Sequence, residues 1–523
     1  MKNVKIYDTT LRDGSQGEGI SYSAHDKIRI TTALDRFGIH YIEGGWPGSN
    51  PKDMEFFLRA KSLRLKSAKL VAFSMTRRQG IKAQDDASLK ALLKSGVKYV
   101  TIVGKTWDLH IKDVLKVSLE ENIAMIKDTI NFLVENGIIV FYDAEHFFDA
   151  YLSNKDYALK CLKVAQEAKA QAICLCDTNG GMLPSQIQAI VKEVLAYAKV
   201  MLGIHCHNDA GVAVANSICA IEAGCDLVQG TINGIGERCG NADLVAIMAN
   251  LQLKLKNNCV GEKLKELVHL SHFVNEISNM RQKNDQPYVG DSAFAHKGGM
   301  HINAVMKNPK TYEHTNPESV GNRRRMLVSE LGGKTGIILR AKNLQLDLTK
   351  DNPKTKEILK TIQELEHQGY HFEAAEASFE LLMRRAFNQY KSFFELEGFR
   401  VVIEKVSDKK ITSEAIIKVK VKGQKEHTAA EGDGPVNALD NALRKALKEF
   451  YPTLSKMHLS DFKVRVLDEK SGTAAKVRVL IQSQDEKDTW NTIGVSENII
   501  EASWQALLDS VEYKLLKDHP KKS

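Results

Sequence analysis

The sequence predicts an α/β protein: a closed (β/α)8 barrel, then a mostly helical linker region, then a C-terminal α+β domain. Two observations predict the barrel. Eight short apolar runs alternate with amphipathic helical stretches in the first half of the chain, and each run is apolar along nearly its whole length. Such runs are typical of parallel strands that are buried on both faces. In the tail, apolar and charged residues alternate instead, which predicts a separate antiparallel sheet.

The eight predicted strands recur at intervals of about one strand and one helix. They are residues 4–9, 41–46, 69–74, 99–104, 138–145, 172–178, 200–207 and 227–233. Eight such units within about 250 residues favour a closed barrel. The alternative is an open doubly wound sheet, which would carry a GxGxxG turn after its first strand. The sequence there, DTTLRDGSQGEG, lacks that spacing.

Three domains are expected: the barrel over residues 1–275, helical linker subdomains over residues 276–392, and the α+β domain over residues 393–523. In the last domain, strand-like runs alternate apolar and charged side chains, as strands with one solvated face do. These runs are residues 399–406, 415–423, 462–469 and 476–484. Helical stretches over residues 435–450 and 498–516 follow the two pairs of runs, so a strand–strand–helix unit is expected twice.

Composition argues against several classes of partner. With 43% hydrophobic and 26% charged residues, the chain is expected to be globular. The net charge of +8 comes from scattered lysines and arginines without a basic, aromatic-rich stripe, so no nucleic-acid partner is expected. The sequence has no apolar signal core and no membrane-spanning run, and its eight cysteines form no CxxC pair. We therefore expect a cytoplasmic protein with reduced thiols and no membrane partner.

Ligand-type side chains follow several predicted strands. His205 and His207 close the seventh run and point the same way, because side chains alternate along a strand. The carboxyl ends of barrel strands share one face, so Asp13 after the first strand and Asn241 after the eighth are expected beside them. Two imidazoles, a carboxylate and an amide oxygen suit a divalent ion such as Mn, Mg, Co or Zn. The alternative, two hydrogen-bonded strand-end histidines, stays open from the spacing alone.

Two further segments have competing interpretations. The DTTLRDG segment could be a helix-capping loop, since Asp and Thr cap helices readily. The adjacent Arg12 and Asp13 instead favour a site that grips a carboxylate beside a metal. The GGKTG segment resembles a phosphate-binding loop, but Val328 occupies the position where that motif requires its first glycine. Lys334 is therefore expected to be a surface or packing residue.

The motifs DTTLRDGSQGEG, GIHCHNDAGVAVANS, GERCGNADL and HKGGMHINAV occur in this order along the chain. They resemble those of the isopropylmalate, homocitrate and citramalate synthases, a family of metal-dependent acyl-CoA condensing barrels. The longer phrases YIEGGWPGSNPKD and FYDAEHFFDAY look most like the (R)-citramalate branch. The resemblance spans essentially the whole chain. It implies a catalytic barrel, linker subdomains that contribute to the active site, and an allosteric regulatory domain in the tail.

The resemblance also implies roles for individual residues. The metal ligands would be Asp13, His205, His207 and Asn241. Arg12 would stabilise the enolate or carbonyl oxygen near the ion, and Thr178 would hydrogen-bond the carboxylate of the keto acid.

Further residues match positions around the substrate. His110 matches a substrate-side histidine, and Glu145 matches a glutamate implicated in acid–base work or in positioning acetyl-CoA. His301 and Tyr312 match linker residues that reach over the active site from a partner subunit. Asp143 departs from the family, which often has Ser or Tyr there, and it could tune the choice of keto acid or support the site from behind.

The function implied is condensation of acetyl-CoA with pyruvate to (R)-citramalate, with release of CoA. A homodimer is expected, with isoleucine as a feedback effector bound by the tail. The tail could instead be a dimerisation module without an effector. The alternative activities are those of a 2-isopropylmalate synthase, a homocitrate synthase or a hydroxymethylglutaryl-CoA-lyase-type enzyme. A non-catalytic metal-binding barrel is a further alternative.

Overall fold

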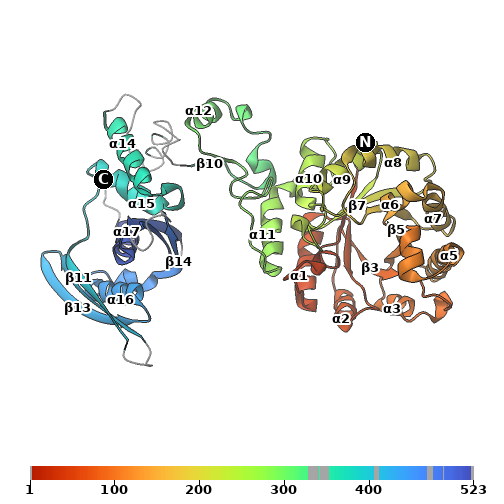
Figure 1. The fold of residues 1–523 in the computed structure, drawn as a ribbon, viewed down its shortest axis with the longest axis horizontal. Helices are drawn as coiled ribbons and strands as arrows, with labels where there is room; N and C mark the ends of the chain where they lie inside the picture. The colour runs from red at the N-terminus through yellow and green to blue at the C-terminus, as the bar shows by residue number, and fades with distance from the viewer. Residues whose placement is uncertain are drawn as a thin grey trace. The chain divides into compact units, whose positions relative to one another are not determined.

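Figure 1 shows the computed structural model, which describes residues 3–327, 338, 341, 353–405, 411–467, 475–486 and 488–519. The chain forms two compact units. The first consists of Met1–Phe294 and His314–Arg324, and the second of Ala295–Glu313 and Arg325–Ser523. Each unit has a hydrophobic core of its own.

The first unit contains a closed barrel of eight parallel strands, which confirms the predicted (β/α)8 fold. The strands are β1 (Lys5–Asp8), β2 (Tyr41–Gly45), β3 (Lys69–Met75), β4 (Tyr99–Lys105), β5 (Ile139–Glu145), β6 (Ala172–Asp177), β7 (Met201–Cys206) and β8 (Leu227–Gly230). Every strand falls on one of the eight predicted runs. The barrel closes because β1 pairs with two strands: Tyr7 lies opposite Tyr41 of β2 and opposite Gln229 of β8.

The apolar character of the runs follows from burial on both sides. Successive side chains of a strand point to opposite faces, so Ile6 packs into the core shared with the helices while Tyr7 fills the barrel interior. The interior cluster also includes Val71, Phe141 and Leu227. These side chains close the barrel below the site, so the carboxyl ends of the strands form a cavity with a solid floor.

Helices surround the barrel (Figure 1). They are α1 (Ala24–Phe37), α2 (Pro51–Ala60), α3 (Ala87–Ser95), α4 (Asp108–His110), α5 (Leu119–Glu135), α6 (Phe147–Ser153), α7 (Lys155–Glu167), α8 (Pro184–Leu195), α9 (Ala213–Ala223), α10 (Leu244–Leu253) and α11 (Leu267–Ile277). Their ends are encoded locally. Ser23 and Asp26 form a reciprocal capping box at the start of α1, and Gly38 ends that helix in the left-handed conformation.

The second unit begins with the linker region. Its elements are β9 (Ala295–His296), α12 (Gly299–Lys307), β10 (Arg325–Met326), α14 (Pro353–Gln368) and α15 (Glu376–Ala386). β9 and β10 form a short parallel pair. The GGKTG segment, residues 332–336, lies outside the described residues.

The tail contains two sheets, each followed by one helix. The first sheet has β11 (Phe394–Glu404), β12 (Thr412–Val421) and β13 (Gln424–Gly432), followed by α16 (Pro435–Leu447). The second has β14 (His458–Val466), β15 (Val477–Gln484) and β16 (Thr489–Ser496), followed by α17 (Ile499–Asp518). Both sheets are antiparallel, and the duplication is confirmed.

The predicted strand–strand–helix order was wrong in one respect, because each of the two repeats in the tail has three strands before its helix. β13 reads QKEHTAAEG and lacks the apolar alternation by which strands were identified. It forms because a tight turn at Lys422 and Gly423, both with positive φ, folds the chain back onto β12. The backbone pairing of a hairpin can thus define a strand that its side chains do not reveal.

Across the described part of the chain, none of the helices combines the length and the apolar character that a bilayer span requires.

A buried ion pair joins α1 to α2, and its aspartate also holds α2 against the end of β2. Lys27 Nζ lies 2.6 Å from Asp53 Oδ1, with side chains only 3% and 8% exposed, and the Trp46 backbone N–H donates to Asp53 Oδ2 at 2.8 Å. Asp53→Ala would leave the Lys27 ammonium buried without its partner. It should lower the free energy of unfolding by about 3–5 kcal/mol, measured by urea denaturation of the full chain.

The matched control is Glu55→Ala in the same helix. Glu55 and Arg59 form an ion pair with side chains 50% and 55% exposed, so its loss should cost less than about 1 kcal/mol. Equal losses in the two variants would contradict the stabilising role of the Lys27–Asp53 pair.

Candidate active site

Polar side chains gather in one cavity of about 260 Å³ at the carboxyl ends of the strands. Seven of the residues singled out from the sequence line it, namely Arg12, Asp13, Asp143, Glu145, Thr178, His205 and His207. The barrel therefore brings together side chains from its first, fifth, sixth and seventh β/α units, because the carboxyl ends of its strands share one face.

Three of these side chains form a candidate metal centre. One donor atom each from Asp13, His205 and His207 lies within 4.8 Å of the others, and all three side chains are buried. The Nε2 atoms of His205 and His207 lie 3.4 and 4.0 Å from Asp13 Oδ2, longer than an ordinary hydrogen bond. This spacing suits donors that surround a small cation better than a directly hydrogen-bonded pair.

Gln229 orients one of the two imidazoles. Its Nε2 donates to Asp143 Oδ1 at 2.9 Å, so its Oε1 is left to accept from His205 Nδ1 at 3.0 Å. His205 therefore carries its proton on Nδ1 and turns the lone pair of Nε2 toward Asp13, which is the form of the ring that binds a metal. Burial lowers the pKa of His205 to about 4, so the ring is neutral near pH 7.

Asn241 lies beside the cavity and completes the predicted set. Its backbone forms a bridge with that of His207. Its Nδ2 donates to Ile235 O at 3.2 Å, whereas its buried Oδ1 has no hydrogen-bond partner among the residues that the structure describes. A buried amide oxygen without a partner is costly unless something binds it, and a cation would satisfy it. The loop depends on Gly240, which has φ +88° and where a Cβ would overlap the carbonyl oxygen of Gly234.

Arg12 is held by a glutamate that the sequence analysis missed. Arg12 Nε donates to Glu43 Oε1 at 2.6 Å, and the guanidinium lies 4.0 Å from the ring centroid of Phe73. Glu43 also accepts from the hydroxyl of Tyr7. Glu43 lies in the middle of β2 (Tyr41–Gly45), so a rule that looks for polar residues after the strand ends does not locate it.

Buried acids outnumber buried bases at the cavity floor. Within the described barrel, Asp13, Glu43 and Asp143 are buried carboxyl groups, and Arg12 is the guanidinium that faces them. Burial raises the pKa of Asp143, and the charge of Glu43 raises it further. Even with Asp143 protonated, the carboxylates of Asp13 and Glu43 face the single guanidinium of Arg12. A divalent cation would offset the excess negative charge.

Glu145 and Thr178 occupy the wall of the cavity. Glu145 pairs with Lys105, a second lining residue that the sequence analysis did not single out. Thr178 Oγ accepts the backbone N–H of His146 at 2.9 Å, which leaves its hydroxyl hydrogen free for another partner. His110 is not among the residues that line the cavity. The centroid of its ring lies 4.3 Å from the ring centroid of His146.

His301 and Tyr312 belong to the second unit. Their ring centroids are 4.1 Å apart, and both side chains are exposed. The structure thus pairs these two predicted residues with each other.

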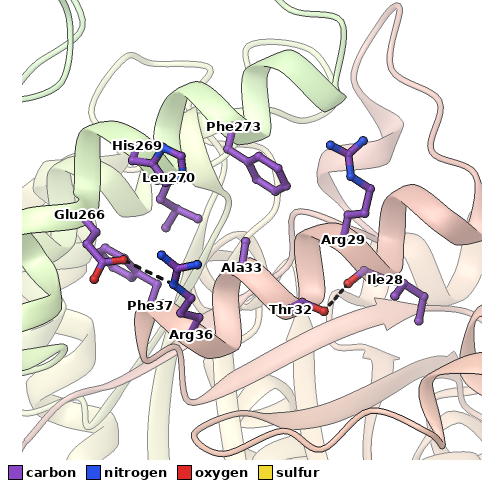
Figure 2. Close-up of a pocket in the computed structure, with 10 residues that line it drawn as sticks. All are labelled: Ile28, Arg29, Thr32, Ala33, Arg36, Phe37, Glu266, His269, Leu270 and Phe273. Carbon is purple, nitrogen blue, oxygen red and sulfur yellow. Dashed lines mark hydrogen bonds and ion pairs between the residues drawn. The ribbon is translucent and has the colours of Figure 1, made fainter.

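A second cavity of about 340 Å³ lies on the outside of the barrel, between α1 and α11 (Figure 2). Its centre is apolar, with Ala33, Leu270 and Phe273 between the two helices, and Arg36 pairs with Glu266 at 3.8 Å toward one end. The groove contains none of the predicted catalytic or metal-binding residues, so the cavity at the strand ends is the candidate active site.

Comparison with known families first gives the class of the protein. The HMGL-like family matches residues 3–274. A domain described as homocitrate synthase post-HMGL domain-like matches residues 288–370, and the LeuA allosteric (dimerisation) domain matches residues 373–515. The barrel is therefore of the HMGL-like class.

Individual relatives then narrow the family. The chain is 55% identical over 519 residues to the (R)-citramalate synthase of Geobacter sulfurreducens, covering 99% of this chain and 98% of that one. It is 54% identical over 520 residues to the (R)-citramalate synthase of Aquifex aeolicus, with the same coverage of 99% and 98%. Identity to the 2-isopropylmalate synthase of Methanocaldococcus jannaschii is 32% over 520 residues, covering 98% and 95%. The chain belongs to the (R)-citramalate synthase family of acyltransferases, which confirms the resemblance seen in its motifs.

The Gln229 bridge generates a prediction about metal affinity. Gln229→Leu removes the acceptor that fixes the proton on His205 Nδ1, so affinity for Mn²⁺ should fall by about 10–100-fold, measured by calorimetric titration. The matched control is Gln252→Leu on α10, where the amide donates to Gly261 O at 2.7 Å away from the cavity. We expect the control to bind Mn²⁺ like the wild type; unchanged affinity in Gln229→Leu would show that the bridge does not orient a ligand.

Proposed function

We propose that the chain catalyses metal-dependent condensation of acetyl-CoA with pyruvate, followed by thioester hydrolysis, to give (R)-citramalate and CoA. The observation that carries the proposal is the gathering of a divalent-ion donor set, Arg12 and Thr178 in one cavity. A 2-keto acid needs a polarised carbonyl and partners for its carboxylate, and this set supplies both. The higher identity to (R)-citramalate synthases, 55% against 32% for a 2-isopropylmalate synthase, favours pyruvate as the acceptor.

A divalent ion held by Asp13, His205, His207 and Asn241 would act as a Lewis acid on the keto carbonyl. Arg12 adds a fixed positive charge. Because Glu43 occupies its Nε and Phe73 packs on its face, the guanidinium cannot swing away from the cavity. It therefore offsets the negative charge that develops on the reacting oxygen without reorganising.

Thr178 binds the carboxylate of the keto acid. Its Oγ already accepts the His146 N–H, so the remaining role of the hydroxyl is to donate. Phe73, Met75 and Val103 line the same cavity and offer an apolar wall for the methyl group of pyruvate. His110 supports this side of the site through its contact with His146. Asp143 supports the opposite side by holding Gln229.

The methyl group of acetyl-CoA is a very weak acid and needs a base within hydrogen-bond reach. Glu145 is one candidate, because it lines the cavity and is held there by Lys105. His301 is the other, supported by its contact with Tyr312 in a region related to homocitrate synthases. In that case both residues would reach over the barrel from the linker region of a partner subunit.

The tail supplies assembly and control in this proposal. Its match to the LeuA allosteric (dimerisation) domain supports a homodimer and an effector site. The effector we propose is isoleucine, because citramalate formation can open a threonine-independent route to that amino acid. Feedback would then act on the first step of the route.

Keto-acid selectivity tests the activity. Purified protein with Mn²⁺ should release CoA from acetyl-CoA with a kcat/KM at least about 10-fold higher for pyruvate than for 2-ketoisovalerate or 2-ketoglutarate, because the larger acceptors overfill the apolar wall. CoA release is followed with a thiol reagent. Asp13→Ala should abolish release while leaving the circular dichroism spectrum intact. Preference for 2-ketoisovalerate would replace this proposal with a 2-isopropylmalate synthase, and cleavage of a hydroxyacyl-CoA without an acceptor would replace it with a lyase.

Effector response tests the role of the tail. Isoleucine should lower the rate of CoA release, while leucine and valine at equal concentration serve as matched controls of similar size and charge. We expect the half-inhibitory concentration of isoleucine to be at least about 10-fold lower than theirs, because an apolar pocket that fits one side chain discriminates by about this factor against one that differs by a methylene group. If none of the three amino acids changes the rate of CoA release, the effector role would be wrong and the tail would be a dimerisation module alone.

A further inference from the structure

Two cysteines and one aspartate form a second group of donors inside the barrel. Cys174 and Cys176 lie two residues apart on β6, so both side chains point to the same face. Asp143 on β5 pairs in register with Cys174, and paired residues of parallel strands also share a face. That face is the interior, because Asp143 reaches Gln229 on β8, which is not a neighbour of β5 in the sheet. One donor atom from each residue lies within 4.8 Å of the others.

We infer that Asp143, Cys174 and Cys176 form a second metal site, selective for thiophilic ions such as Zn²⁺ and Cd²⁺. Ligands about 2.3 Å from a tetrahedral ion lie about 3.8 Å apart, so donors within 4.8 Å need shifts of only about 1 Å to close on one ion. The fourth position faces the cavity and can take water.

The donor chemistry separates this site from the one formed by Asp13, His205 and His207. Two sulfurs and one oxygen are a soft set, which prefers Zn²⁺ or Cd²⁺ and has little affinity for Mg²⁺. Two imidazoles with carboxylate and amide oxygens are a harder set, which accepts Mg²⁺ and Mn²⁺. Saturating Mg²⁺ can therefore occupy the first site while leaving the second free.

An ion can reach the second site from the candidate active site. Cys176 and Asp143 both line that cavity, whereas Cys174 lies two residues deeper along β6. Burial raises the pKa of the Cys174 thiol, so the empty site holds neutral thiols that do not repel one another. Binding displaces the two thiol protons and the proton of the Asp143 carboxyl group to solvent, and bonds from the two sulfurs and one carboxylate oxygen to the metal replace them.

The two sites are adjacent. Cys176 pairs in register with His205, and Gln229 links Asp143 to His205 through two hydrogen bonds. A thiophilic ion that takes Asp143 would withdraw the acceptor of Gln229. The second site is therefore positioned to disturb the first.

The test titrates the full-length protein, in saturating Mg²⁺, with Cd²⁺. Thiolate-to-cadmium charge transfer reports sulfur binding in the ultraviolet. The wild type should bind one equivalent with this signal, and Cys174→Ser and Cys176→Ser should each weaken binding by at least about 10-fold, because serine keeps the size but not the soft donor. Cys239→Ser is the matched control, since it removes the exposed thiol and should leave the signal unchanged.

Cadmium-edge X-ray absorption on the wild type gives a readout that needs no variant. It should find two sulfur neighbours. No sulfur neighbour, or a signal lost only in Cys239→Ser, would overturn the inference. Equal binding of Cd²⁺ by the wild type, Cys174→Ser and Cys176→Ser would also overturn it.

Discussion

The pairing of β1 with β8 is the constraint on which the site depends. Asp13 follows β1 and Asn241 follows β8, so in an open sheet the two residues would stand at opposite edges. Closure of the barrel makes these ends neighbours and places them beside His205 and His207 at the end of β7. A centre built from the two ends of the fold therefore assembles only when the whole barrel has formed.

The interior of the barrel is apolar at one end and charged at the other. Near its floor, Tyr7 packs with Phe141 and Leu227 yet also donates its hydroxyl to Glu43. Above this layer, two of the buried carboxyl groups are hydrogen-bonded to fixed partners, Glu43 to Arg12 and Asp143 to Gln229. Carboxyl groups this deeply buried are stable only with such partners, so the polar layer is rigid before any ligand arrives.

Sequence patterns predicted the eight barrel strands and the gathering of strand-end residues such as Asp13, His205 and His207, because both follow from a regular alternation of strand and helix. Asp143 was singled out only through the family resemblance. The patterns did not identify Glu43, Gln229 or Lys105. Glu43 and Gln229 are single polar residues inside apolar runs, and Lys105 directly follows the fourth run. Their roles become visible only once the contacts across the barrel are known.

The sequence also could not show how the second unit is built in detail. β13 was missed because it is polar on both faces, and its identity comes from backbone pairing with β12. His301 and Tyr312 were linked to the barrel only by family resemblance. Their contact with each other depends on the fold of the segment after β9, which local periodicity does not encode.

The four tryptophans are divided evenly between the two units, with an optical consequence. Trp46 lines the cavity edge-on to Phe73, and Trp107 stacks on the ring of His110. Trp490 and Trp504 are instead sealed in the core of the tail. Indole emission from Trp46 thus responds to whatever enters the cavity, while emission from the tail responds to the packing of its own core. Replacing either pair of tryptophans with phenylalanine would leave fluorescence from one unit alone, so that the two units could be followed separately.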